Sequence, residues 1–145
     1  SLEGQTVSTE PSAAVCAVVG LAGPYDLLKG YQNTTKQNAA EGAAVRSMLE
    51  SFLGGSPEKV PDAYREASPV THVRKGSPPM LLVHGTKDTL VPIEQSAFME
   101  EKLREAGVEV DFLRVEGGTH DDFGPGFDEA MARLLAFVKK HLQLP

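Results

Sequence analysis

The segment PMLLVHGTKDTLVP, at residues 79–92, carries the strongest indication of the fold. Its apolar run, residues 80–83, is typical of a strand, and it stops at a His-Gly pair that is soon followed by Asp88. Further along, a second strand-like run leads to a Gly-Gly-Thr-His sequence that ends at His120. The interval between the two motifs fits one helix and one strand. We therefore expect a parallel sheet with Asp88 and His120 in neighbouring loops at its carboxyl edge.

A carboxylate and a histidine placed in this way suit proton transfer. An imidazole can accept a hydroxyl proton only when its other nitrogen carries hydrogen and the ring is held in place, and a carboxylate provides both. Asp88 and His120 are thus candidates for the orienting acid and the general base of a nucleophilic hydrolase, with an expected oxygen–nitrogen distance of about 3 Å. The alternatives are a turn-forming acid and an exposed loop histidine.

The rest of the chain alternates strand-like and helical patterns. This order predicts an α/β fold with a parallel sheet of about three strands flanked by helices. The predicted strands are residues 13–22, 80–84 and 108–115. The predicted helices are Ala39–Leu53, Pro61–Ala67, a helix with Pro92 in its first turn that ends at Gly107, and Phe127–Leu142, whereas residues 25–38 are predicted to form a loop.

Composition narrows the function classes. The 145 residues are 41% hydrophobic and 23% charged, as in globular domains, and carry a net charge of −6. The acidic balance argues against nucleic acid and against anionic lipid as partners, and no apolar run approaches the roughly 20 residues of a membrane span. No metal-ligand spacing or cofactor motif is present. The single cysteine, Cys16, lies in a predicted apolar strand and is expected to be inert core.

Several elements together resemble the C-terminal half of α/β-hydrolase-fold serine carboxylesterases of the lipase and esterase group, most closely the bacterial feruloyl and acetyl esterases. The acid-loop element is residues 78–85 with Asp88, Val91-Pro92 and Gln95-Ser96, and the histidine loop is residues 117–120. Spacer-like elements are Leu53-Gly54-Gly55-Ser56-Pro57 and Ala67-Ser68-Pro69. The resemblance covers roughly residues 14–142, and it implies that Asp88 is the acid and His120 the base of a catalytic triad.

The nucleophile of that family lies in a Gly-x-Ser-x-Gly turn, and no such pentapeptide occurs in these residues. The nearest match, residues 54–58, lacks the last glycine, and Pro57 has no N–H to stabilise an oxyanion. We therefore expect residues 1–145 to form a single partial domain that lacks the nucleophile-bearing N-terminal half. The chain alone is expected to be inactive. Its expected partners are a small-molecule ester and either the missing half as a second chain or further copies of itself.

Alternatives remain at this stage. The leading hypothesis is a carboxylesterase that works through an acyl-enzyme. A prolyl-oligopeptidase-like serine peptidase has the same acid–histidine layout, and an inactive fragment or binding module would keep the fold without the chemistry. His84, His72 and His141 are interpreted as structural or surface residues, Ser68 as a turn cap, and Asp121 and Asp122, where the family more often has glycine, as a solvated acidic loop. The localisation is left open.

Overall fold

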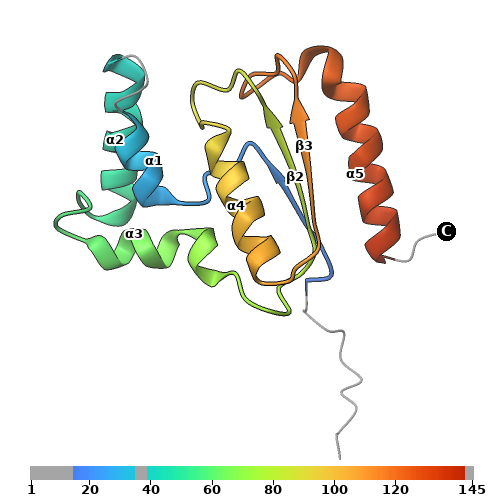
Figure 1. Cartoon of the computed structure of the whole chain (residues 1–145). Coiled ribbons are helices and arrows are strands. Elements are labelled where there is room, and N and C mark those ends of the chain that lie inside the picture. Colours follow the sequence, from blue (N-terminus) through green and yellow to red (C-terminus); the bar gives the residue numbers. More distant parts are fainter. Residues whose placement is uncertain (1–14, 35–38, 143–145) are drawn as a thin grey trace, which may run out of the picture.

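A computed structural model describes residues 15–34 and 39–142, and its centre is a sheet of three parallel strands (Figure 1). The strands are β1 (Val18–Leu21), β2 (Met80–Gly85) and β3 (Val110–Val115), and they lie side by side in the order β1-β2-β3. Two further turns of chain form 3-10 helices, Pro69–His72 and Gly124–Gly126. The parallel α/β sheet expected from the sequence is confirmed.

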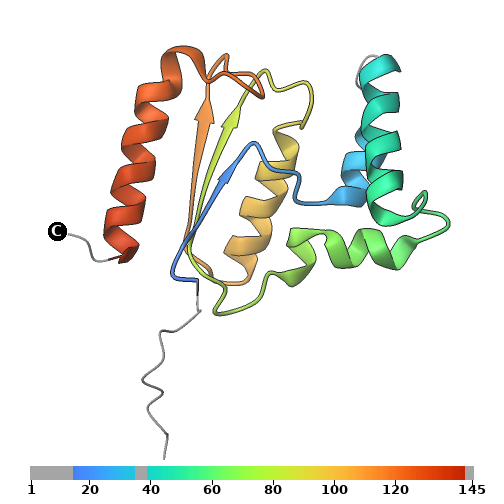
Figure 2. The same ribbon diagram turned by 180° about the vertical axis from the view of Figure 1, so that it is seen from behind.

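Helices cover both faces of this sheet. In Figures 1 and 2, α4 lies against one face and α5 against the other, while α1, α2 and α3 form a group beside α4. The bounds of the helices are α1 Leu27–Asn33, α2 Ala39–Leu53, α3 Pro61–Ala67, α4 Glu94–Glu105 and α5 Phe127–Leu142.

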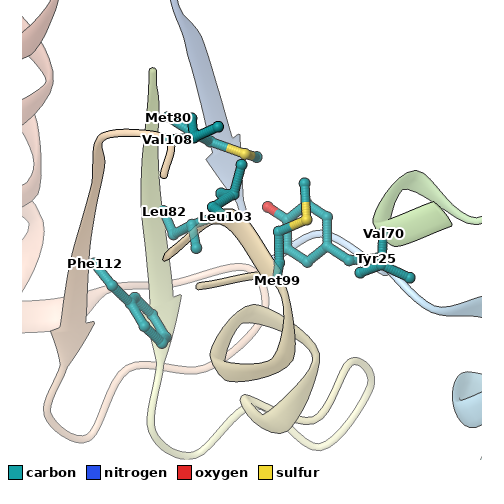
Figure 3. Packing of buried hydrophobic residues seen from close by; sticks show 8 residues of the cluster. All are labelled: Tyr25, Val70, Met80, Leu82, Met99, Leu103, Val108 and Phe112. Carbon is teal, nitrogen blue, oxygen red and sulfur yellow. The ribbon is translucent and has the colours of Figure 1, made fainter. Parts of the chain in front are cut away.

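Strand β2 is the centre of the core, and every one of its residues is buried. Successive side chains of a strand point to opposite faces, so Leu82 packs on the α4 side of the sheet and Leu81 on the α5 side. The α4-side cluster is drawn in Figure 3 and includes Leu82, Leu103 and Phe112. Because both faces of β2 are covered, its sequence has no polar alternation.

The segment predicted as a loop is instead partly helical. Residues 27–33 form α1, and residues 35–38 lie outside the described part of the chain. Asp26 caps this helix by accepting a hydrogen bond from the Lys29 backbone N–H at 2.9 Å. The hydroxyl of Ser68 accepts another from the Leu27 N–H at 2.9 Å. Since Ser68 lies 41 residues away, the local pattern did not contain this stabilising contact.

Three other sequence predictions need correction. Residues 13 and 14 of the first predicted strand lie outside the described part of the chain, residues 15–17 are not strand, and β1 begins at Val18, so Cys16 precedes it with an exposed side chain instead of lying in the core. Strand β3 begins at Val110, two residues later than predicted. Helix α4 begins at Glu94, so Pro92 precedes the helix.

The start of α4 has a physical cause. The N–H of Val91 donates to the Asp88 carboxylate, and the Val91 carbonyl accepts from His84, so this backbone is engaged outside any helix.

Within residues 15–34 and 39–142, no helix combines the length and the apolar character that crossing a membrane requires.

Candidate active site

Asp88 is a buried carboxylate at the carboxyl edge of the sheet. It follows β2 by three positions, and its side chain is fully buried. Its Oδ1 atom accepts hydrogen bonds from the backbone N–H groups of Leu90 at 2.9 Å and Val91 at 2.8 Å. Asp88 therefore forms the turn that a loop carboxylate often forms, and its second oxygen remains for another partner.

That partner is His120. The Nδ1 atom of His120 lies 2.8 Å from Oδ2 of Asp88, which confirms the predicted juxtaposition of the two loops and the predicted distance. Because a carboxylate oxygen only accepts, Nδ1 carries the hydrogen and Nε2 is left as the basic nitrogen. The His120 side chain is 30% exposed, so the ring can meet a molecule from solvent while its partner cannot. This pair can move a proton.

His84 adds a second imidazole to the same carboxylate. Its Nε2 lies 3.1 Å from Oδ2 of Asp88 and 2.8 Å from the Val91 carbonyl oxygen, and its Nδ1 lies 2.7 Å from the Ser96 hydroxyl. Since the carbonyl can only accept, Nε2 carries the hydrogen, and the Ser96 hydroxyl donates to Nδ1. His84 is completely buried, as its structural interpretation required. Its direct contact with Asp88 was not predicted.

The two loops are held together by a close backbone contact. Gly85 ends β2, and a β-carbon placed on it would lie 2.3 Å from the carbonyl oxygen of Gly118. Hydrogen bonds run across the same contact, from the Lys87 N–H to the Gly118 carbonyl at 2.8 Å and from the Gly117 N–H to the Thr86 hydroxyl at 2.9 Å. The glycines of both motifs thus set how closely Asp88 and His120 approach.

Asp122, two residues after His120, is bonded within its own loop. Asp122 accepts a hydrogen bond at its Oδ1 from the Gly124 N–H at 2.7 Å, and its carbonyl accepts from the Thr119 N–H at 2.8 Å. Both Asp121 and Asp122 are exposed. The interpretation of these residues as a solvated acidic loop agrees with this placement.

The remaining candidates have structural contacts. The Ser68 hydroxyl donates to the Tyr64 carbonyl at 2.6 Å and accepts from the Leu27 N–H, so its contacts are structural, although its side chain does not cap the turn that follows it. His72 lies outside the site, with its Nε2 at 2.6 Å from the Glu66 carbonyl. Among the described residues, no group of three or more His, Cys, Asp and Glu side chains could hold a metal ion.

Comparison with known proteins places these observations in context. The BD-FAE family model matches residues 2–103, which include Asp88. The chain is 32% identical over 102 residues to the uncharacterized peptidase YtmA of Bacillus subtilis (strain 168), covering 70% of the chain and 37% of YtmA. It is 32% identical over 117 residues to esterase LipC of Mycobacterium tuberculosis (strain ATCC 25618 / H37Rv), covering 79% of the chain and 26% of LipC.

Among solved structures, a truncated form of a carbohydrate esterase from gut microbiota superimposes with a TM-score of 0.64 at 28% identity. That alignment covers 84% of this chain and 42% of the esterase. The chain therefore spans about a quarter to two fifths of the length of these relatives.

Proposed function

The chain belongs to the BD-FAE family and is an α/β hydrolase of the esterase type, and from this premise we propose that it is the acid- and base-bearing part of a serine carboxylesterase. In this proposal Asp88 orients His120, and His120 is the general base. The observation that carries the proposal is the 2.8 Å contact from His120 Nδ1 to a fully buried Asp88 oxygen, with His120 itself reachable from solvent.

The proposed reaction has two steps. A serine hydroxyl attacks the ester carbonyl while Nε2 of His120 takes the hydroxyl proton, and the same nitrogen then gives that proton to the departing alkoxide. Water next attacks the acyl-enzyme with His120 again as base, which releases the acid and restores the serine. During each proton transfer the Asp88 carboxylate stabilises the imidazolium.

The serine and the oxyanion donors are proposed to come from polypeptide outside residues 1–145. Two facts support this part of the proposal. No Gly-x-Ser-x-Gly sequence occurs in the chain, and the relatives are between two and four times longer than the portion that aligns with it. The partial domain would then be completed by the remainder of a longer protein or by a second chain.

A fluorophosphonate probe tests where the nucleophile lies, because it reacts with activated serines. The native protein that contains this chain is labelled, digested and analysed by mass spectrometry. We expect a modified serine outside residues 1–145, lost in the His120→Ala variant. A modified serine within these residues, together with 4-nitrophenyl acetate hydrolysis by the chain alone that depends on His120, would overturn the proposed placement.

Peptide cleavage is the second candidate, because one relative carries the name of a peptidase and the same acid–base pair serves amide substrates. Parallel assays with 4-nitrophenyl acetate and with peptide 4-nitroanilides separate the two activities. A higher kcat/KM for the ester supports the esterase. A kcat/KM that is higher for the anilides would assign the site to peptide substrates.

A further inference from the structure

We propose that a cavity beside His120 binds an uncharged, extended apolar group of the substrate; this inference rests on the proposed esterase function. The cavity, called here the His120 cavity, has a volume of about 690 Å³. That is within the size range of small-molecule sites in proteins, which is roughly 300–1,000 Å³. His120 forms part of its wall, so a molecule in the cavity lies next to the proposed base.

The wall is built by several parts of the chain that are distant in sequence. Helix α2 contributes Ala44, Val45, Met48 and Leu49, helix α1 contributes Leu27 and Gly30, and further lining comes from the end of β1 and the loop before α4. No Asp, Glu, Lys or Arg lies among the described residues of this wall. An ionised substrate group would lose its hydration in the cavity without gaining a counter-charge, so the lining selects against it.

The one amide side chain in the wall, Gln95, is already occupied. Its Oε1 accepts hydrogen bonds from the backbone N–H groups of Tyr25 at 2.9 Å and Asp26 at 2.7 Å, and its Nε2 donates to the Asp26 carbonyl at 3.1 Å. These bonds join α4 to the segment between β1 and α1. Gln95 thus shapes the cavity with its Oε1 occupied by two backbone N–H groups and its Nε2 bonded to the Asp26 carbonyl, whereas His120 faces the cavity as the reactive group.

Exposed apolar side chains gather at the same place. Leu21 is 54% exposed, Met48 62% and Leu90 42%, and all three line the His120 cavity although they come from β1, α2 and the loop after β2. Apolar side chains that converge on one concave site are typical of ligand-binding surfaces. An acyl chain or an apolar alcohol would cover them.

A tryptophan on α2 tests the assignment. Ala44→Trp places a large ring in the cavity, whereas Ala43→Trp adds the same ring at the adjacent position of α2, which is exposed and outside the cavity lining. Both variants are made in the native protein, and kcat/KM is measured with 4-nitrophenyl acetate and octanoate to vary the acyl side, and with methyl and octyl acetate to vary the alcohol side.

We expect Ala44→Trp to lower kcat/KM at least tenfold for one of the two long esters, 4-nitrophenyl octanoate or octyl acetate. For the short esters kcat/KM should change less than twofold. Ala43→Trp should leave every ester within twofold. The affected series identifies whether acyl or alcohol group occupies the cavity. If Ala44→Trp leaves both long-to-short ratios unchanged while hydrolysis still depends on His120, the cavity assignment is overturned and the esterase proposal stands.

A binding measurement tests the cavity independently of ester hydrolysis. The uncharged fluorophore N-phenyl-1-naphthylamine should increase in fluorescence when added to the native protein that contains this chain, and Ala44→Trp should weaken its binding at least fivefold relative to Ala43→Trp. Binding with this pattern in a native protein that hydrolyses no ester would support the cavity and overturn the esterase. Equal binding by both variants would count against the cavity.

Discussion

The carboxylate of Asp88 accepts from His84 and from His120 at the same oxygen, Oδ2, at 3.1 and 2.8 Å. Its other oxygen accepts from the backbone N–H groups of Leu90 and Val91. A buried carboxylate is costly unless charge-assisted hydrogen bonds compensate its desolvation, and four donors do so here. This arrangement fixes the orientation of Asp88 before any substrate binds, with His84 as a positioning residue.

Replacing His84 with Leu is expected to destabilise the chain by about 3 kcal/mol. The apolar side chain fills a similar space but leaves the Val91 carbonyl and the Ser96 hydroxyl without this partner in a buried site. The matched variant Ser96→Ala removes a single contact of His84 and should cost about 1 kcal/mol. Urea unfolding measures both values. Equal losses in the two variants would contradict the central place assigned to His84.

The elements that the sequence predicted best are those that depend on their own residues. The bounds of α2, α3 and α5 agree with the predictions, because their apolar spacing and flanking glycine or proline residues are local signals. Helix α1 was missed although Asp26 is a local capping residue, because the chain just before the helix and its first N–H are held by Gln95 and Ser68, which lie 70 and 41 residues from their partners. Periodicity over a short window contains no such information.

The candidate site likewise contains one contact that could be predicted from the sequence and one that could not. The proximity of Asp88 and His120 could be predicted, because parallel strands bring their carboxyl ends to one edge of the sheet. The contact of His84 with Asp88 requires knowledge of the turn between them. One signal was present in the sequence: a histidine at the end of an apolar strand is buried, and a buried imidazole needs partners for both nitrogens.

Gly85→Ala is expected to push the two loops apart. Its β-carbon would lie 2.3 Å from the Gly118 carbonyl oxygen, a backbone atom that cannot move without the loop that carries His120. Overpacking of this kind costs about 1–3 kcal/mol. The control is Gly30→Ala in α1, where the nearest atom would lie at 3.7 Å and helix propensity favours alanine. The midpoint temperature of thermal unfolding should fall for Gly85→Ala and should stay the same or rise for Gly30→Ala. The reverse order would refute the close contact at Gly85.

Tyr25 makes the stability sensitive to alkaline pH. Burial raises the pKa of its phenol from 10.0 to about 12. Because the folded-state pKa lies above the unfolded value, this contribution to stability is fully present below pH 10 and is lost as the pH rises from 10 through 12. A shift of this size corresponds to about 2–3 kcal/mol.

The measurement is the free energy of unfolding in urea at pH 9 and pH 11.5. We expect Tyr25→Phe, which keeps the aromatic ring, to lose less stability over this interval than the unaltered chain. The phenols of Tyr31 and Tyr64 also have raised pKa values, so some alkaline loss persists in the variant. Identical losses in variant and parent would show that Tyr25 does not titrate with unfolding.

The open edge of β1 is expected to make the isolated chain self-associate. Among the described residues, β1 pairs with β2 alone. The N–H groups of Val18 and Ala22 bond toward β2, and since alternate residues of a strand point their N–H groups to opposite sides, those of Val19 and Leu21 face the uncovered edge. An unpaired strand edge with apolar side chains invites pairing with another strand.

A lysine on this edge should reduce the association, because a charge there opposes strand addition. Leu21→Lys is compared with Leu135→Lys. Leu135 is equally exposed, at 54%, but belongs to helix α5 and not to a strand. Light scattering of the 145-residue chain should show oligomers for the parent and for Leu135→Lys, and a larger monomer fraction for Leu21→Lys. A parent chain that is monomeric at assay concentrations would refute the prediction. If both lysines reduce the oligomers equally, association occurs through exposed apolar side chains in general. The edge of β1 would then not be the contact between the chains.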